Sequence, residues 1–271
     1  MTALRRMRPL LGCYVEVGAR GGDAGRAIEA AFAAIEVAQR RWSFQEPDSE
    51  LSRLNGSGGE RVHLHAHTLR LLCLCRALMH RSGGHFDCTV GGLLVRAGAL
   101  PDHGGTRALP RGRADDIEIG PGWARLRRPL RLTLDGIAKG FAVDLALRAL
   151  RRGGACAGWI NAGGDLRVFG DIALPVQRRE LDGRITPLGN LRNGAIASTR
   201  AGAPDAAFGA HVVAPAGHAA ACGVWSVLAR SAWRADALAK VAATAMPARR
   251  EALVRQLGGC VLTAAPMEAA A

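Results

Sequence analysis

The sequence predicts an α+β fold, in which mixed and largely antiparallel sheets pack against helices in two intimately associated lobes. Three observations favour this class. Apolar residues recur at helical spacing in well-separated stretches such as 24–41 and 68–82. After residue 170, short apolar segments follow one another with turn residues between them, which is typical of antiparallel strands. Finally, 49% of the 271 residues are hydrophobic, enough to bury a substantial core.

The spacing of apolar and turn residues predicts the elements in order. We expect a strand at 9–18, a helix at 24–41, a loop at 42–56 with a short helix that begins at Asp48 or Ser49, an extended segment at 61–68, a helix at 68–82, strands at 117–119 and 123–127, a strand that ends at Leu134, a helix from Ile137 to the glycines 153–154, a strand before the glycines 163–164, strands at 175–181, 194–201, 209–215 and 223–232 with a turn at 189–194, helices at 235–244 and 247–257, and a strand at 259–262. We interpret residues 1–262 as one domain with a lobe boundary in the polar connection 100–116, and residues 263–271 as a loose tail.

The rest of the chain is organised around the stretch 131–170. Three leucines from Leu130 to Leu134 alternate with polar residues, as in a strand, and residues 135–136 end the alternation. An amphipathic helix then begins inside the sequence GIAKG. Amide groups in the first turn of a helix can bind an anion, and Lys139 adds a mobile cation beside them. We therefore expect a phosphate group to bind at this turn.

Lysine is rare in this chain. Of the 36 basic residues only Lys139 and Lys240 are lysines, so arginine is the usual cation. A site that needs a compact point charge resists replacement by the larger, planar guanidinium. The rarity favours a functional role for both lysines, although chance survival in an arginine-biased sequence gives the same count.

The net charge of +13 suits a substrate that carries phosphate groups. Nucleic acid is not expected as a partner, because the arginines are spread along the whole chain and there is only one tyrosine. No run of about 20 apolar residues is present, so no segment is expected to span a membrane.

Seven scattered cysteines indicate neither disulfides nor a metal bound by cysteine. The N-terminal residues show no signal peptide and no context for a lipid-bearing cysteine. We therefore expect a cytoplasmic protein, with the periplasm as the alternative if the natural start lies upstream.

His63, His65 and His67 alternate along a segment predicted to be extended, so they would share one face. A metal site is one interpretation. However, same-face neighbours on a strand are about 6.6 Å apart, which leaves the outer pair too distant for easy chelation of one ion. We therefore do not favour a metal here.

Seven segments in this order resemble the ApbE-like family of FAD:protein FMN transferases, over nearly the whole chain. They are LLGCYVEV (10–17), PDSELSRLN (47–55), GGHFDCTVGGLL (83–94), LDGIAKGFAVD (134–144), INAGGDL (160–166), HVVAP (211–215) and ADALAK (235–240). Members of this family move an FMN group from FAD to a threonine or serine of an acceptor protein. A single glycine turn before a helix is common, so the order of the segments carries the resemblance.

The resemblance implies that FAD lies over the central turn. It implies contacts to FAD from His85, Phe86 and Asp87, from Lys139, and from the backbone near Val213. The expected partners are thus FAD and an acceptor flavoprotein with a threonine or serine flavinylation motif.

The resemblance also implies a catalytic base and a magnesium ion. His211 occupies the place of the family's base, which takes the proton of the acceptor hydroxyl. The ion would be held beside the FAD diphosphate by the Gly136 carbonyl and by an aspartate and a threonine one helical turn apart. Asp236 matches the aspartate, but the threonine position is Lys240.

The chain departs from the family pattern elsewhere too. The aspartate at the start of the glycine motif is Thr133 here, with Asp135 two places on, and we count both as candidate cofactor-binding residues. The aromatic of the early serine-rich loop is Gln45, and the aspartate after the histidine is Ala214.

Lys240 is the most serious departure, because an ammonium group has no lone pair to offer a metal ion. Two outcomes stay open. The ammonium takes the place of the ion, or it swings aside and leaves magnesium to Asp236, the Gly136 carbonyl, phosphate oxygens and water.

Three functions are therefore compared. The leading hypothesis is an FAD:protein FMN transferase. The second is a degenerate relative that binds FAD without transferring FMN. The third is an unrelated α+β domain in which the glycines only form turns and His211 is a core residue.

Overall fold

A computed structural model of the chain describes residues 3–202 and 212–262. Its largest element is a seven-stranded sheet in which every neighbouring pair of strands is antiparallel. The strands lie in the order β1 (Leu4–Leu10), β2 (Cys13–Arg20), β6 (Ala157–Ala162), β7 (Asp165–Phe169), β10 (Ala195–Ala201), β11 (Gly223–Ala229) and β12 (Gly259–Leu262). With the packed helices described below, this arrangement confirms the predicted α+β class.

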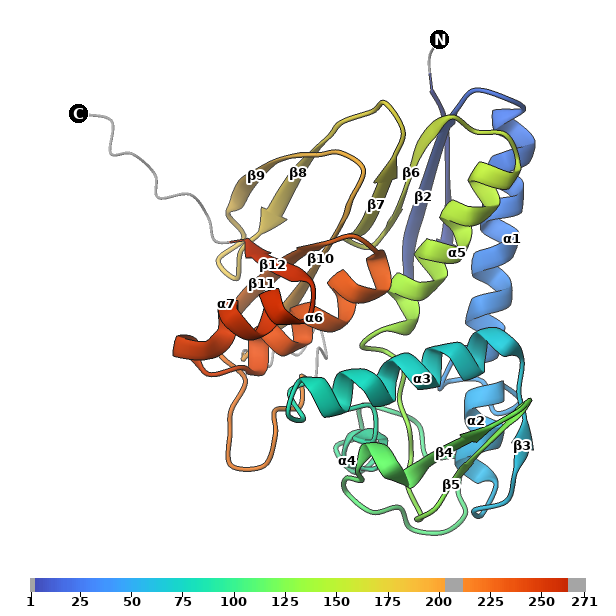
Figure 1. The fold of residues 1–271 in the computed structure, drawn as a ribbon, viewed down its shortest axis with the longest axis vertical. Helices are drawn as coiled ribbons and strands as arrows, with labels where there is room; N and C mark the ends of the chain where they lie inside the picture. The colour runs from blue at the N-terminus through green and yellow to red at the C-terminus, as the bar shows by residue number, and fades with distance from the viewer. Residues whose placement is uncertain (1–2, 203–211, 263–271) are drawn as a thin grey trace.

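Helices cover one face of this sheet (Figure 1). They are α1 (Ala24–Trp42), α5 (Ala138–Arg152), α6 (Ala232–Thr244) and α7 (Pro247–Gln256). Val15 and Val17 of β2 pack with Phe32 of α1 and Val143 of α5 in a fully buried cluster. Alternate residues of β2 face the helices because side chains of a strand point in turn to its two faces.

A two-stranded ribbon packs on the opposite face of the sheet. It consists of β8 (Leu174–Arg179) and β9 (Ile185–Leu191). Its apolar side meets Trp159 and Val168, which pair across β6 and β7 and point away from the helices. The sheet is therefore buried on both sides where the ribbon covers it.

The second lobe lies below the sheet in Figure 1. It contains α2 (Glu50–Gly56), α3 (Ala66–Arg81), α4 (Gly91–Arg96), a 3-10 turn at Ala114–Asp116, and a small antiparallel sheet of β3 (Val62–His63), β5 (Trp123–Leu126) and β4 (Ile117–Gly120). Its core around Leu71 and Ile117 continues to Phe141 of α5 and Leu238 of α6. The two lobes thus share one hydrophobic core, which explains their intimate association.

The strand predicted at Leu130–Leu134 is wrong, although all three leucines are buried. Among the described residues, its one β-type pairing is an isolated parallel β-bridge between Val90 and Arg131. The side chain of Asn55 replaces a neighbouring strand: its Nδ2 donates to the Leu132 carbonyl at 2.9 Å and its Oδ1 accepts from the Leu132 amide at 2.7 Å. The alternation therefore reflects burial in an extended segment and not sheet pairing.

Three further expectations differ wholly or in part from the structure. The single strand predicted at 9–18 is a hairpin of β1 and β2, whose turn residues Leu11 and Gly12 have φ of 55° and 70°. Of the turn predicted at 189–194, residues 189–191 belong to β9, whereas residues 192–194 do form the connection between β9 and β10. Residues 212–215, the described part of the strand predicted at 209–215, form no strand.

The histidine segment is not extended throughout. Only His63 lies in β3, whereas His65 caps the N-terminus of α3 and His67 lies in its first turn. Among the described residues no group of three or more His, Cys, Asp or Glu side chains is placed to hold a metal ion. The alternative of a histidine metal site therefore finds no support in the described part of the chain.

The start of α6 is fixed by a residue distant in sequence. The two carboxylate oxygens of Asp144 accept hydrogen bonds from the amides of Ala232 and Trp233, at 3.1 and 3.0 Å. Such a cap satisfies amides that have no partner within the helix. This explains why α6 begins three residues before the predicted start at Ala235.

The described cysteines form no disulfide. Within the ranges 3–202 and 212–262, none of the helices has the length and apolar character needed to cross a lipid bilayer.

We predict that Asn55→Ala destabilises the protein by about 1–3 kcal/mol for each Leu132 backbone group left buried without a partner. Denaturant unfolding monitored by circular dichroism measures the free energy of unfolding. Asn190→Ala, at an exposed position of β9, is the control and should stay within about 0.5 kcal/mol of the unmodified protein. Equal stability of the two variants would contradict the role given to Asn55.

Candidate functional site

A cavity of about 870 Å³ opens between the two lobes. Its walls come from the central turn, the segment after α3, the β8–β9 ribbon, β10, α6 and the residues after the undescribed segment 203–211. The lining includes His85, Phe86, Asp87, Thr133, Asp135, Gly136, Lys139, Val213 and Lys240. The structure therefore brings together all the described residues assigned to a site from the sequence except Asp236, which is buried behind Lys240.

A second cavity of about 460 Å³ lies on the other side of the central turn. It is lined by the hairpin turn at 11–12, the end of α1 and residues 43–46, which include Gln45. Asp135 and Lys139 line both cavities. The central turn is thus the wall that the two hollows share.

The amides of the central turn are largely used within the protein. Those of Ile137 and Ala138 donate to the Leu134 carbonyl at 2.9 and 2.7 Å, and that of Gly140 donates to Asp236 Oδ2 at 3.0 Å. Our expectation that these first-turn amides receive an anion is therefore wrong for these three residues. The cations that line the cavity are side chains, those of Lys139, Lys240, Arg179 and Arg200, and the two lysines lie at the central turn.

Lys139 is held by a buried aspartate. Its Nζ lies 3.3 Å from Oδ2 of Asp165, whose side chain is only 2% exposed. Burial, together with the charge of Asp236, raises the pKa of Asp165, while the negative charge of Asp165 raises the pKa of Lys139. Because the ammonium is stabilised, Lys139 stays positively charged over the physiological pH range.

Asp165 lies in the segment INAGGDL, but the sequence predicted no role for it. Asp165 begins β7 directly after the glycine turn 163–164. A carboxylate in a strand that is otherwise mostly buried needs a partner. That local contrast was the signal that could have identified Asp165 from the sequence.

Asp236 and Lys240 lie one helical turn apart on α6 and contact each other through Oδ1 and Nζ. The other oxygen of Asp236 accepts the Gly140 amide, which links α6 to the start of α5. This close approach depends on glycine, because a Cβ at Gly140 would lie 2.4 Å from the Ala232 carbonyl oxygen. Gly136 is also near, since its Cβ would lie 3.9 Å from Cε of Lys240.

These residues do not form a set of magnesium ligands. Magnesium requires near-octahedral oxygen donors, and the ammonium of Lys240 provides none. Both oxygens of Asp236 already have partners, Lys240 and the Gly140 amide. The donor chemistry of the described residues therefore does not fit the ion that the resemblance implies.

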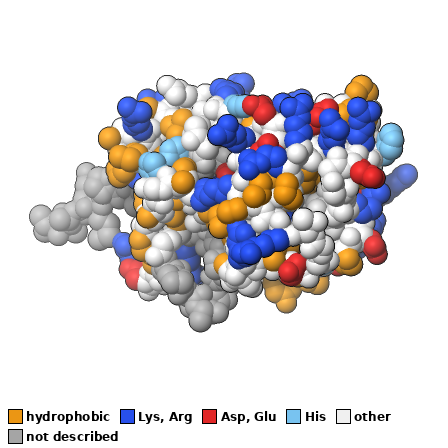
Figure 2. All heavy atoms as spheres, turned by 90° about the horizontal axis from the view of Figure 1, so that it is seen from below, with side chains coloured by type: hydrophobic (Ala, Val, Ile, Leu, Met, Phe, Trp, Pro, Cys, Tyr) orange, Lys and Arg blue, Asp and Glu red, His pale blue; other side chains and the backbone are white. Residues whose placement is uncertain are grey.

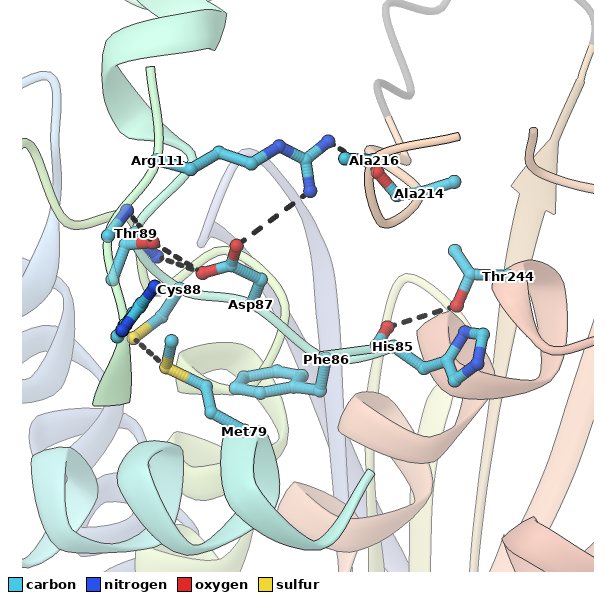
Figure 3. Close-up of polar contacts among 12 residues, drawn as sticks. Met79, His85, Phe86, Asp87, Cys88, Thr89, Arg111, Ala214, Ala216 and Thr244 are labelled. Atoms are coloured by element: carbon cyan, nitrogen blue, oxygen red, sulfur yellow. Dashed lines mark hydrogen bonds and ion pairs between the residues drawn. The ribbon is translucent and has the colours of Figure 1, made fainter. Parts of the chain in front are cut away.

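On the opposite wall, the segment 85–87 is fixed by hydrogen bonds (Figure 3). Thr244 Oγ1 donates to the His85 carbonyl at 3.0 Å, and the backbone amide of Phe86 donates to Ser82 Oγ at 3.0 Å. Asp87 Oδ1 accepts from the amide and hydroxyl of Thr89 at 2.7 and 2.6 Å. These contacts fix the backbone and present the side chains of the segment to the cavity.

The pKa of His85 is lowered, which favours the neutral form of its ring. Burial and the neighbouring ring of His218, whose centroid lies 5.9 Å away, lower its pKa. Its Nδ1 is buried and has no hydrogen-bond partner among the described residues. A neutral histidine can offer this nitrogen to a ligand in the cavity.

Arg111 is a second residue that sequence reasoning missed. Its guanidinium lies 3.9 Å from Asp87 Oδ2 and donates to the Ala214 carbonyl (Figure 3). It thereby ties residues 212–216 to the cavity wall. It belongs to the polar connection 100–116, which the sequence indicated only as a lobe boundary.

His211, the predicted base, lies outside the described residues. The neighbouring Val213 lines the larger cavity, as expected for a ligand contact.

Surface charge gives no sign of a continuous basic stripe on the face seen in Figure 2. There, Lys and Arg side chains are scattered with apolar and acidic side chains between them.

Comparisons with known proteins agree with this fold. No curated protein matches the chain by sequence. Three solved structures are similar to it, each at 20% identity: the ApbE protein of Thermotoga maritima, with a TM-score of 0.82 over 96% of this chain and 93% of that one; the flavinyl transferase ApbE of Pseudomonas stutzeri in its apo form, with 0.77 over 96% and 91%; and the flavin transferase ApbE of Vibrio cholerae, with 0.75 over 94% and 91%.

At that identity the likeness establishes the fold alone. The family model, described as the ApbE family, matches residues 11–262 and thus nearly the whole sequence. The chain therefore belongs to the ApbE family.

Proposed function

We propose that the protein transfers an FMN group from FAD to a threonine or serine hydroxyl of an acceptor protein. The observation that carries this proposal is the pair of cavities that share Asp135 and Lys139. A dinucleotide has two bulky ends joined by a diphosphate. It fits this arrangement with one end in each cavity and the diphosphate over the turn, where Lys139 is charged and fixed.

The cavity walls suit the rest of the ligand. Phe86 is an apolar ring in the wall of the larger cavity, and His85 and Asp87 beside it offer polar groups. Thr133 donates to Asp135 Oδ2 at 3.0 Å and so orients this carboxylate on the shared wall. Val213 completes the opposite side. These residues position the nucleotide, whereas Lys139 neutralises its charge.

The transfer is a substitution at phosphorus. The acceptor oxygen forms a bond to the phosphorus of the FMN half, the bond from that phosphorus to the bridging oxygen breaks, and AMP leaves with that oxygen. The hydroxyl proton passes to His211, which the family position assigns as the base. Cations near the diphosphate lower the barrier because they stabilise the charge that develops on the leaving AMP.

A mass-spectrometric assay tests the proposal. The protein is incubated with FAD and a family-type acceptor peptide that contains a threonine, with magnesium and with chelator. We expect the peptide to gain the mass of one FMN group and AMP to be released in equal amount. A peptide in which the threonine is replaced by alanine is the control. Tight FAD binding without any mass gain would favour the degenerate, FAD-binding alternative instead.

We predict that Lys139→Met weakens FAD binding by about 10- to 100-fold, because a charge-assisted contact contributes about 1.5–3 kcal/mol. Binding of FMN, which has no diphosphate, should change less. Flavin fluorescence titration measures both affinities. Arg152→Met, an exposed cation at the far end of the same helix, is the matched control. The placement fails if the unmodified protein binds FMN as tightly as FAD.

We predict that His211→Ala slows transfer by about 100- to 10,000-fold, the usual cost of losing a general base. Its affinity for FAD should stay nearly unchanged, because the base acts on the acceptor hydroxyl. Single-turnover transfer and FAD titration separate the two effects. His63→Ala, an exposed histidine of β3, serves as the control. Loss of FAD binding or of the fold in His211→Ala would mean that this histidine is a packing residue.

A further inference from the structure

The inference concerns Lys240, which lines the larger cavity and has a side chain that is 24% exposed. Its ammonium contacts Oδ1 of Asp236, a residue that is completely buried. The ammonium of Lys240 is thus held by Asp236 on its buried side, and the side chain remains accessible from the cavity.

Its stem crosses the central turn. A Cβ at Gly136 would lie 3.9 Å from both Cγ and Cε of Lys240, and 3.3 Å from the ring of Phe86. The absence of a side chain at Gly136 lets the lysine lie against the turn. The ammonium is therefore held beside the central turn. The other lysine, Lys139, belongs to that turn and lines both cavities.

The hydroxyl of Thr244, on the same helix, does not restore a metal site. Thr244 stands one helical turn after Lys240, but its Oγ1 donates to the His85 carbonyl at 3.0 Å and lies 3.0 Å from the Lys240 carbonyl. It supports the segment 85–87 and is not directed at Asp236. Asp236, the carboxylate that the resemblance assigns to the ion, thus gains no hydroxyl beside it from Thr244, and both of its oxygens already have partners.

Charge balance explains what the lysine contributes. Three carboxylates, Asp135, Asp165 and Asp236, influence one another at the turn. The ammonium groups of Lys139 and Lys240 oppose them at the turn, so loss of Lys240 would lower the net charge of these five side chains from −1 to −2 with all of them ionised. A diphosphate approaching that charge would need a metal ion, whereas a tethered ammonium neutralises Asp236 from within the chain.

We propose that the Lys240 ammonium is a built-in cation for the diphosphate of the bound nucleotide, and that it makes nucleotide binding independent of a divalent metal. This inference rests on the proposed FAD site. It differs from what the family resemblance implies, because the departure at position 240 changes the chemistry of the site from metal coordination to a fixed ion pair. A lysine suits this role better than an arginine, because its compact charge fits between a carboxylate and a phosphate.

Calorimetric titration of the full chain with FAD, in magnesium and in excess chelator, tests the inference. ADP, which has the diphosphate but no flavin, is titrated in parallel. We expect the affinity of the unmodified protein to agree within about twofold between the two conditions, because its cation is covalently attached. An affinity that falls tenfold or more in chelator would overturn the inference.

Three variants sharpen the test. Lys240→Thr restores an oxygen donor one turn after Asp236, so its FAD affinity should drop by about tenfold or more in chelator and recover with magnesium. Lys240→Met removes the charge without supplying a donor, and should bind weakly in both conditions. Arg234→Met removes a cation from the same helix whose guanidinium lies over Trp233, and should behave like the unmodified protein. Circular dichroism confirms that each variant is folded.

The outcomes separate the two proposals. If Lys240→Met binds FAD in chelator as tightly as the unmodified protein, the ammonium does not contribute and the inference fails while the FAD site stands. If the folded, unmodified protein binds neither FAD nor ADP under either condition, the proposed function fails and the inference fails with it.

Discussion

The site depends on the burial of Asp236. Burying a carboxylate costs free energy unless both of its oxygens have partners. In Asp236 the Gly140 amide donates to one oxygen and the Lys240 ammonium to the other. The first contact joins α6 to the start of α5, and the second holds a cation beside the turn that precedes α5. Gly140 permits this arrangement, because a side chain there would collide with the Ala232 carbonyl. Packing of two helices thus determines where the positive charge of the cavity lies.

Both lysines of this arginine-rich chain follow the same plan. Lys139 is held by Asp165 and Lys240 by Asp236, and both aspartates are buried. Cations fixed in advance need little reorganisation when a charged ligand arrives, which is the condition for strong electrostatic stabilisation. The many arginines instead lie mostly on the surface or form ion pairs there. The rarity of lysine noted in the sequence therefore coincides with a distinct structural role.

The sequence predicted the fold class and most helices because their signals are local. Periodic apolar residues define α1 and α3, and the glycines 153–154 end α5 within one residue of the expected position. It could not predict features that depend on distant partners. Asn55 replaces a strand beside Leu132, and Asp144 moves the start of α6, across separations of 77 and 88 residues.

The candidate site shows the same division. The family resemblance placed His85, Lys139 and Lys240 in one site, and the structure brings them to one cavity. Asp165 and Arg111 were missed because their roles arise from contacts made in three dimensions. The hydrogen bonds from the turn amides to Leu134 and Asp236 could not be predicted either. A glycine turn before a helix has the same sequence pattern whether its amides are free or paired.

A crystal structure of the protein with FAD, grown in the presence of a chelator, tests the central claim most directly. The account predicts that the diphosphate lies over residues 136–140, within hydrogen-bond distance of the ammonium groups of both Lys139 and Lys240, with the two ends of FAD in the two cavities. A diphosphate bound elsewhere, or a Lys240 side chain turned away from both Asp236 and the phosphates, would contradict it.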